Sequence, residues 1–413
     1  MGKTVSFSEL VEKIFDQIDI SPTQYKEAVS HYRAVSGVLV DGEAGTDIYV
    51  QGSFSLGTVT RPFKGGKDAD FDLDIVCQGK DQKASIEPKQ LKNRVKECIL
   101  ASPHHSRLLD KDEGRRCWTL NYTPDASGVG FHMDILPCVS ESTDIVNAIK
   151  PLCPKPEYAD SAIAITDKDK ILQTYGWSSG NPRGYARWFL DINAPYLIPV
   201  VNQQKLAFIE SGAFASIAEV PDPLLKSPLQ RAIQLLKRHR DCRFDGRSNA
   251  DDKPISIIIT TLAAQIAKRY PLHVITTQDM LTTIIRGLKQ YARLLESNFE
   301  DYARMLPRDY FTRTQQKGWE IPNPVNCEEN FAERWGENND AKARAFFQWV
   351  DWVASDFDFD GKDSGAVFSQ LQSGFGSEMI RCAYQSLELN PIHTPTIITA
   401  SSLGAPPKPY LLK

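Results

Sequence analysis

The sequence lacks the features that mark a membrane protein or a secreted one. No segment is an uninterrupted apolar run of about 18 residues, the length that a membrane-spanning helix needs. The first residues, MGKTVSFSELVEK, lack the apolar stretch of a secretory signal. From these absences we expect a soluble, cytoplasmic protein with no membrane partner.

The sequence also lacks an excess of charge of one sign. It has 48 Lys and Arg residues against 52 Asp and Glu residues, which gives a formal net charge of -4. A protein whose main task is to hold long nucleic acid binds it through many phosphate contacts and carries an excess of positive charge. We therefore expect no long nucleic acid as a partner, although a local basic cleft remains compatible with this composition.

Clustered metal-binding cysteines are lacking as well. The eight cysteines are scattered along the chain, form no C-x-x-C pair and have no clustered histidines beside them. These spacings give no support for a zinc site, and we expect buried, reduced thiols. The cysteines are Cys77, Cys98, Cys117, Cys138, Cys153, Cys242, Cys327 and Cys382.

The order of structural signals along the 413 residues predicts an α+β fold with two domains. Alternating or β-rich runs predict strands at 47–50, 70–76, 117–122 and 130–136. Helical periodicity predicts a long helix in two parts at 6–40, then helices at 87–100, 227–241, 254–270, 276–297 and 339–357. We expect a mixed domain at 1–205, a helical domain at 206–390 and an extended or flexible tail at 391–413.

Two helix starts are marked by the same capping signature. Ser21 and Ser227 are each followed by proline and, three residues on, by glutamine. A serine cap, a proline in the first turn and a glutamine that closes the capping box favour a helix start at each place.

The stretch DFDLDIV at 70–76 carries aspartates at alternate positions. Because side chains alternate across a strand, Asp72 and Asp74 share one face while the apolar residues share the other. Two carboxylates on one face form a site for a divalent cation such as Mg²⁺, which binds through one or two carboxylates and substrate phosphates. The alternative is a solvated strand face. Asp68 and Asp70 are placed outside this pair, in a flexible insertion, RPFKGGKDAD.

Two further motifs favour the metal site. Gly52 and Ser53 follow the strand at 47–50, where glycine allows the backbone to approach a phosphate; alone, this turn is a weak signal. In FHMDILP, residues 131–137, Asp134 alternates with apolar residues on a separate strand. A carboxylate there costs free energy unless a cation lies nearby.

The order of these motifs resembles the DNA polymerase beta-like nucleotidyltransferases. The segments QGSFSLGTVTRP, SGNPRGYARWF, LQRAIQLLKRHRD and ENFAERW are similar to those of the bacterial CD-NTases, relatives of cyclic GMP-AMP synthase and oligoadenylate synthetase. The resemblance covers about residues 45 to 360. It implies a mixed-sheet core with an N-terminal spine helix, and a helical-bundle domain that closes a central active-site cleft.

The resemblance implies two-metal phosphoryl transfer. Asp72, Asp74 and Asp134 would be the catalytic metal ligands for two Mg²⁺ ions, with Mn²⁺ as a substitute, and Asp134 is also a candidate acceptor for the hydroxyl proton. Gly52 and Ser53 would hold the departing pyrophosphate, and Gln51 would contact the nucleotide.

The second half offers three further candidates. Lys237 continues the apolar face of its helix, so it is either a snorkelling lysine or, as the resemblance implies, a triphosphate ligand together with Ser256. Asn181 is a candidate reader of the nucleobase, and a helix N-cap is the alternative for this residue.

The leading hypothesis is a monomeric enzyme that joins nucleoside triphosphates into a cyclic di- or trinucleotide. ATP is the expected substrate, and GTP or a pyrimidine triphosphate is an alternative. The resemblance implies that the product activates an effector in anti-phage (CBASS) signalling, with accessory proteins as further partners. The other hypotheses are a template-independent RNA-tailing transferase and a non-catalytic nucleotide sensor or toxin-antitoxin partner. The sequence does not specify the bases or the linkage of the product.

Overall fold

The computed structural model describes residues 7–42, 44–45, 47–122, 130–169, 171–269, 276–296, 298–306, 311–359, 362 and 364–389. The predicted tail at 391–413 lies outside the described residues. Within them, no helix is long and apolar enough to cross a membrane.

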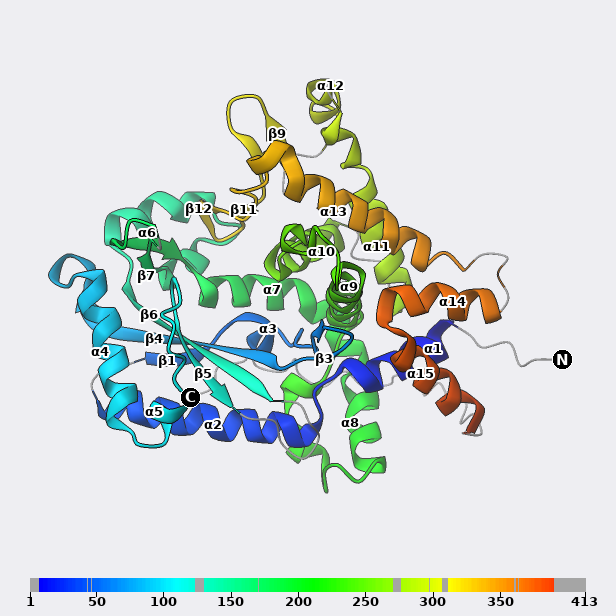
Figure 1. Ribbon diagram of the computed structural model, residues 1–413, viewed down its shortest axis with the longest axis horizontal. Helices are drawn as coiled ribbons and strands as arrows, with labels where there is room; N and C mark the ends of the chain where they lie inside the picture. Colours follow the sequence, from blue (N-terminus) through cyan, green and yellow to red (C-terminus); the bar gives the residue numbers. More distant parts are fainter. Residues whose placement is uncertain are drawn as a thin grey trace.

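A mixed six-stranded sheet forms the first half of the molecule (Figure 1). Its strand order is β1-β4-β6-β7-β8, and β5 pairs with β6; β4 and β6 are parallel and the remaining pairs are antiparallel. The strands are β1 (Asp47–Val50), β4 (Phe71–Gln82), β5 (Trp118–Tyr122), β6 (Phe131–Ser140), β7 (Ile163–Lys168) and β8 (Tyr175–Gly180). The four predicted strands are confirmed, and β7 and β8 were not predicted.

Helices cover one face of this sheet. The predicted two-part N-terminal helix is confirmed as α1 (Phe7–Ile18) and α2 (Pro22–Asp41), and the capping box between Ser21 and Gln24 starts α2. Helix α2 runs beneath the sheet beside α4 (Pro88–Ala101) and α5 (His105–Leu108) (Figure 1). The core between α2 and the sheet contains Leu73, Ile75 and Met133.

Helix α1 packs with the C-terminal helices. It contacts α15 (Ser377–Leu389), and its buried face, which includes Ile14 and Phe15, belongs to the hydrophobic core of the second half. The predicted boundary near residue 205 stays a prediction. The chain passes between the two halves twice: between α1, which packs in the core of the second half, and α2, which packs against the sheet, and again after β8.

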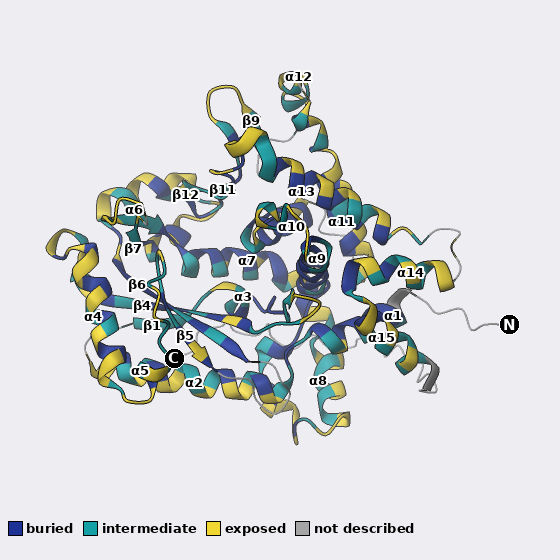
Figure 2. Ribbon diagram, in the orientation of Figure 1, coloured by how far each residue is buried: buried dark blue, intermediate teal, exposed yellow. Residues whose placement is uncertain are grey.

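Helix α9 (Pro228–Phe244) lies at the centre of the second half and is almost entirely buried (Figure 2). Ser227 and Gln230 form the predicted capping box at its start. The surrounding helices are α7 (Pro182–Leu197), α8 (Val201–Glu210), α10 (Ser256–Arg269), α11 (Thr277–Lys289), α12 (Phe299–Ala303), α13 (Glu337–Asp356), α14 (Ser364–Phe375) and α15. Short strands β9 (Thr312–Thr314), β10 (Gly318–Glu320), β11 (Pro322–Asn323) and β12 (Asn326–Asn330) join α12 to α13, and α6 (Thr143–Ile149) follows β6.

The segment predicted as a flexible insertion is instead a hairpin attached to α9. Strands β2 (Phe63–Lys64) and β3 (Lys67–Asp68) pair, and the backbone N–H groups of Gly65 and Gly66 both donate to the Asp245 carboxylate at 2.8 Å. Asp68 forms an ion pair with buried Arg238 at 2.8 Å. The prediction was wrong because the partners of this segment lie about 180 residues away in the sequence.

Candidate active site

The parallel pairing of β4 with β6 brings the three predicted aspartates onto one face of the sheet. Asp74 lies directly opposite Asp134, and Asp72 lies opposite His132. Leu73, which lies between Asp72 and Asp74 on β4, is fully buried on the opposite face, as strand alternation requires. The acid pair and the lone acid of the sequence therefore meet side by side.

The carboxylates raise one another's pKa. The pKa of Asp74 is raised to about 7, first by burial and then by the charges of Asp134 and Asp72. The pKa of Asp72 is also raised, by burial and then by Asp134. A cation between these groups would remove the repulsion and favour their ionised form.

The donor set fits Mg²⁺, which prefers carboxylate oxygens. As the side chains stand, no group of three or more His, Cys, Asp or Glu residues in the described part of the chain has the arrangement of a formed metal site.

Asp134 is held in place by β5. The Thr119 hydroxyl donates a hydrogen bond to Oδ1 of Asp134, and the two residues lie opposite each other in the antiparallel pairing of β5 with β6. Burial, Asp134 and Asp74 together raise the pKa of the neighbouring Cys117 thiol to about 12. Thr119 was not predicted as a site residue, although the alternation of WTLNY places it on the same face as the acids.

The loop after β1 lies against the acids. The backbone N–H of Gln51 donates to the carbonyl of Asp74 at 2.8 Å. Gly52 begins the short helix α3 (Gly52–Ser55) with φ of +62°, and a Cβ there would lie 2.2 Å from Oδ2 of Asp74. Only glycine fits at this position, on grounds of both space and conformation. The carbonyl of Ser53, next in the chain, accepts a hydrogen bond from the N–H of Thr58 at 2.9 Å.

Lys237 connects this loop to α9. Its side chain is 6% exposed, and Nζ donates to the carbonyl of Thr58 at 2.9 Å. Burial, and after it the charge of the nearby Arg240, lower the pKa of Lys237 to about 8, although Asp241, Asp72 and Asp74 oppose the shift. The lysine is therefore a buried cation within the field of the two acids on β4.

Ser256 is connected to α9 through Arg240. It begins α10, and its hydroxyl accepts a hydrogen bond from the guanidinium of Arg240 at 3.0 Å. Arg240 also pairs with Asp241, which in turn binds Lys253 at 3.1 Å. Arg240 was not predicted as a site residue; its only signal is its position one turn beyond Lys237.

Asn181 occupies a different environment. It is 1% exposed and caps α7, where Oδ1 accepts from the N–H of Gly184 at 2.9 Å. Its Nδ2 donates to the carbonyls of Tyr158 and Val325, and Ser161 donates to Oδ1. These contacts use both ends of the amide, so the geometry favours the N-cap alternative over a nucleobase reader.

Comparisons with known proteins agree with this geometry. Residues 46–137 match a family model described as the nucleotidyltransferase domain of the cyclic GMP-AMP synthase DncV-like proteins. The chain is 30% identical over 332 residues to a c-di-GMP synthase from Roseivirga ehrenbergii, an alignment that spans 79% of this chain and 72% of the relative.

A solved structure shares the fold. The CD-NTase CdnG of Bradyrhizobium diazoefficiens, solved in complex with GTP, aligns with a TM-score of 0.66 at 19% identity. The alignment covers 92% of this chain and 99% of that one. The mixed sheet and the helical second half therefore have the same fold as CdnG. The chain belongs to the bacterial CD-NTases, a family of nucleotidyltransferases that synthesise cyclic oligonucleotides.

Proposed function

We propose that the chain is a Mg²⁺-dependent enzyme that condenses nucleoside triphosphates into a cyclic dinucleotide and releases pyrophosphate. The observation that carries this proposal is the pairing of Asp74 with Asp134 on adjacent parallel strands, with Asp72 beside them and buried Lys237 opposite. A cyclic trinucleotide is the alternative product.

Asp72, Asp74 and Asp134 would hold the metal ions, which are Mg²⁺ or, as a substitute, Mn²⁺. When bound, these ions supply charge stabilisation for the triphosphate and lower the pKa of the attacking ribose hydroxyl. The carboxylate of Asp134, fixed by the Thr119 hydroxyl, accepts the proton of that hydroxyl.

The remaining residues orient the triphosphate. The Ser53 hydroxyl and the backbone beside Gly52 bind the departing pyrophosphate, and Gln51 contacts the nucleotide. Lys237 and Ser256 face the same triphosphate from the helical side. Arg240 hydrogen-bonds the Ser256 hydroxyl and so orients it. Among the described residues, the buried ammonium of Lys237 has one hydrogen-bond acceptor, the carbonyl of Thr58, and this leaves N–H donors available for phosphate oxygens.

Guanosine triphosphate is the substrate best supported. A relative of 30% identity is named a c-di-GMP synthase. ATP and pyrimidine triphosphates are the competing substrates. Within the same proposal, the product acts as a second messenger that activates an effector in anti-phage defence, which is the role implied by the family.

The test is incubation of the purified protein with Mg²⁺ and with each nucleoside triphosphate, alone and in pairs, followed by mass spectrometry of phosphatase-resistant products. We expect a guanine-containing cyclic dinucleotide from the wild type and none from the Asp72→Asn/Asp74→Asn double variant. A linear polymer in place of a ring would support the RNA-tailing alternative, and identical results for the two proteins would exclude catalysis at this site.

A further inference from the structure

The side chain of Arg183 joins the helical half of the molecule to the edge of the sheet. Arg183 lies in the first turn of α7, and α7 contributes Tyr185 and Phe189 to the hydrophobic core of the second half. Its guanidinium donates to both carboxylate oxygens of Asp47 on β1, at 2.7 and 3.1 Å. The same guanidinium lies over the ring of Tyr49, 3.7 Å from the ring centroid. One side chain of α7 therefore holds two residues of β1.

Strand β1 is a short strand at the edge of the sheet. It is four residues long, half-buried, and pairs with β4. A strand of this kind opens more easily than a central one, because fewer buried contacts and hydrogen bonds hold it. On the side of α2, the Tyr32 hydroxyl donates to the carbonyl of Ile48 at 2.9 Å. Side chains from two helices, Tyr32 of α2 and Arg183 of α7, therefore restrain β1.

The nucleotide loop, residues 51–58, follows β1 directly. Tyr49 lies opposite Val76 of β4, so it shares the sheet face of Asp74, because alternate residues of a strand share a face. The N–H of Gln51 donates to the carbonyl of Asp74 at 2.8 Å, and a Cβ on Gly52 would lie 2.2 Å from Oδ2 of Asp74. A shift of β1 would therefore move the nucleotide loop relative to the acids.

The start of α7 is itself fixed in the second half. Asn181 caps the helix, and its Nδ2 donates to the carbonyl of Val325, just before β12, at 3.2 Å. One turn into α7, the Tyr185 hydroxyl is hydrogen-bonded to the hydroxyl of Thr261 on α10 at 2.8 Å. Arg183 therefore extends from a helix start that is held in place to a strand that needs support.

The ion pair is too exposed to be a main source of stability. The side chain of Arg183 is 28% exposed and that of Asp47 is 47% exposed. Ion pairs in contact with solvent contribute little to the free energy of unfolding. The two-pronged contact and the stacking on a ring instead fix a geometry, which a lysine would not reproduce. Geometry of this kind matters for a reaction, because a displacement of about 1 Å at a reacting group can lower its rate by about a hundredfold.

We propose that Arg183 is a positioning residue for the nucleotide loop. By holding Asp47 and Tyr49, it fixes β1 and so keeps the loop in place beside the acids of β4 and β6. It acts through β1 and not by contact with the triphosphate. The consequence for turnover rests on the proposed function, whereas the restraint on β1 does not.

The first test is steady-state kinetics of pyrophosphate release by the full-length protein with Mg²⁺ and GTP. Arg183→Met should lower kcat by about tenfold and change KM by less than about threefold, because the loop is displaced and its phosphate-binding groups remain. Arg183→Lys should recover only part of this loss, because an ammonium provides neither the two-pronged contact nor the stacking. Full activity of Arg183→Lys would contradict the proposed role of the guanidinium.

Arg94→Met is the matched control. Arg94 pairs with Asp81 at 2.6 Å near the far end of β4, and the two side chains are 36% and 24% exposed. The two single variants should have similar melting temperatures, whereas Arg94→Met should keep the kcat of the wild type. Asp47→Asn combined with Arg183→Met should lose no more activity than Arg183→Met alone, because the two residues act through one contact. Wild-type kcat in Arg183→Met, or equal losses in Arg183→Met and Arg94→Met, would overturn the proposal.

A second measurement does not require catalysis. Hydrogen exchange of the amides at 47–53 should be at least about tenfold faster in Arg183→Met than in the wild type, and unchanged in Arg94→Met, because only the first variant frees β1. Exchange at 47–53 that is the same in all three proteins would overturn the proposal. A wild type that releases no pyrophosphate would contradict the proposed function alone, since the exchange result does not depend on turnover.

Discussion

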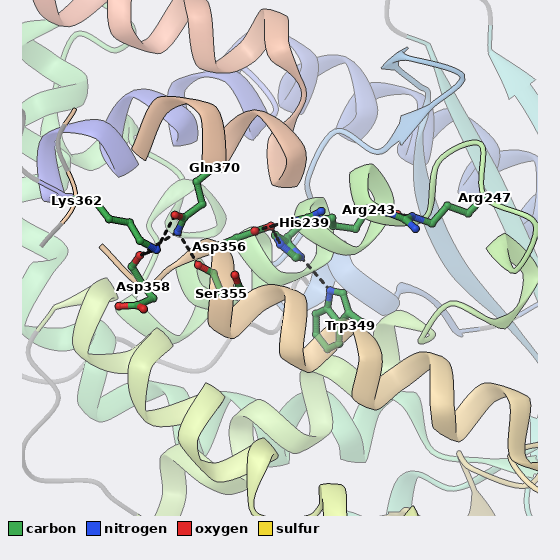
Figure 3. A network of polar contacts seen from close by, with 9 residues as sticks. All are labelled: His239, Arg243, Arg247, Trp349, Ser355, Asp356, Asp358, Lys362 and Gln370. Atoms are coloured by element: carbon green, nitrogen blue, oxygen red, sulfur yellow. Dashed lines mark hydrogen bonds and ion pairs between the residues drawn. The ribbon is translucent and has the colours of Figure 1, made fainter. Parts of the chain in front are cut away.

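Helix α9 has two buried polar faces that differ in how completely their groups are paired. On the side of the β4 aspartates, the described contacts of the Lys237 ammonium include one acceptor, the Thr58 carbonyl, and the charges of Asp72 and Asp74 raise its pKa against burial. On the side of α13, His239 uses both ring nitrogens: Nδ1 accepts from the indole N–H of Trp349 at 3.2 Å, and Nε2 donates to Asp356 at 2.8 Å (Figure 3).

The difference separates a binding surface from a structural one. Asp356 also accepts hydrogen bonds from Arg243, so the network on the α13 side is closed within the protein. A closed network fixes the helix, whereas an open one leaves donors for a ligand. The α13 side therefore positions the helix that carries Lys237 and Arg240.

The largest expected effect comes from removing one carboxylate of the acid pair on β4, on the side of α9 that carries Lys237. Asp74→Asn should lower the rate of cyclic product formation by about a thousandfold or more, because in the proposed function Asp74 would be a carboxylate ligand of the metal ions. Asp70→Asn is the matched control, since Asp70 accepts from the N–H of Gly130 at 2.9 Å at the edge of the same strand. It should retain activity near that of the wild type, measured as pyrophosphate release; equal losses in both variants would contradict the assignment.

The pH dependence of stability provides a second test of the same pair. The pKa of Asp74 is raised in the folded protein, so the folded state binds a proton that the unfolded state has lost above the ordinary pKa of aspartate. Stability of the metal-free protein should therefore fall as pH rises from about 4 towards about 7. In Asp74→Asn this fall should be smaller, as measured by chemical denaturation at each pH. An unchanged slope would show that Asp74 is not the group responsible.

Substitutions in the closed network on the α13 side should lower the stability of the fold more than they lower the catalytic rate. Asp356→Ala leaves the buried His239 and the partly buried Arg243 without their shared partner and should lower the free energy of unfolding by about 3 to 5 kcal/mol. Asp351→Ala, an exposed substitution on the same helix, is the control and should change it by less than about 0.5 kcal/mol. Urea unfolding distinguishes the two, and an Asp356→Ala protein as stable as the control would show that the network is not structural.

Removal of the Lys237 cation should have the opposite effect, lowering the catalytic rate without lowering the stability of the fold. Lys237→Met should leave stability unchanged or higher, because a buried charge is removed. It should lower kcat/KM by roughly tenfold to a hundredfold, because it removes the phosphate contacts that Lys237 makes in the proposed function. Lys92→Met is the control: Lys92 is fully buried on the α4 side and pairs with Glu113 at 3.2 Å. It should lower stability and leave kcat/KM unchanged, and the reverse result would contradict the comparison.

The smallest effect is expected at the hairpin. Asp245→Ala removes the acceptor of the Gly65 and Gly66 N–H groups and should cost about 1 to 2 kcal/mol of stability. Because the hairpin precedes the strand of Asp72, hydrogen exchange at 61–70 should accelerate in this variant. Exchange that is unchanged would show that the hairpin does not depend on α9.

Local sequence rules predicted the parts of the site that lie on strands. The two-residue period of DFDLDIV was enough to separate Asp72 and Asp74 from their apolar neighbours, and the same rule placed Asp134. The capping boxes at Ser21 and Ser227 were likewise readable, because all their groups lie within four residues.

The remaining features depend on long-range contacts. Strand β8, with the sequence YGWSSG, has small residues and no clear alternation, so pairing with β7 rather than local preference makes it a strand. The attachment of Asp68 to Arg238 joins residues that are far apart in the chain. Arg240 carries no local signal that distinguishes it from surface arginines, and its role depends on how α9 is rotated in the core.

The most direct test of the account is the change in melting temperature on adding Mg²⁺ with a non-hydrolysable GTP analogue. The account predicts a rise of several degrees for the wild type, because ligand binding to the folded state alone stabilises it. The same addition should produce no rise in Asp74→Asn and a full rise in Asp70→Asn. An equal rise in all three proteins would contradict the claim that the acid pair on β4, facing Lys237, is where metal and nucleotide bind.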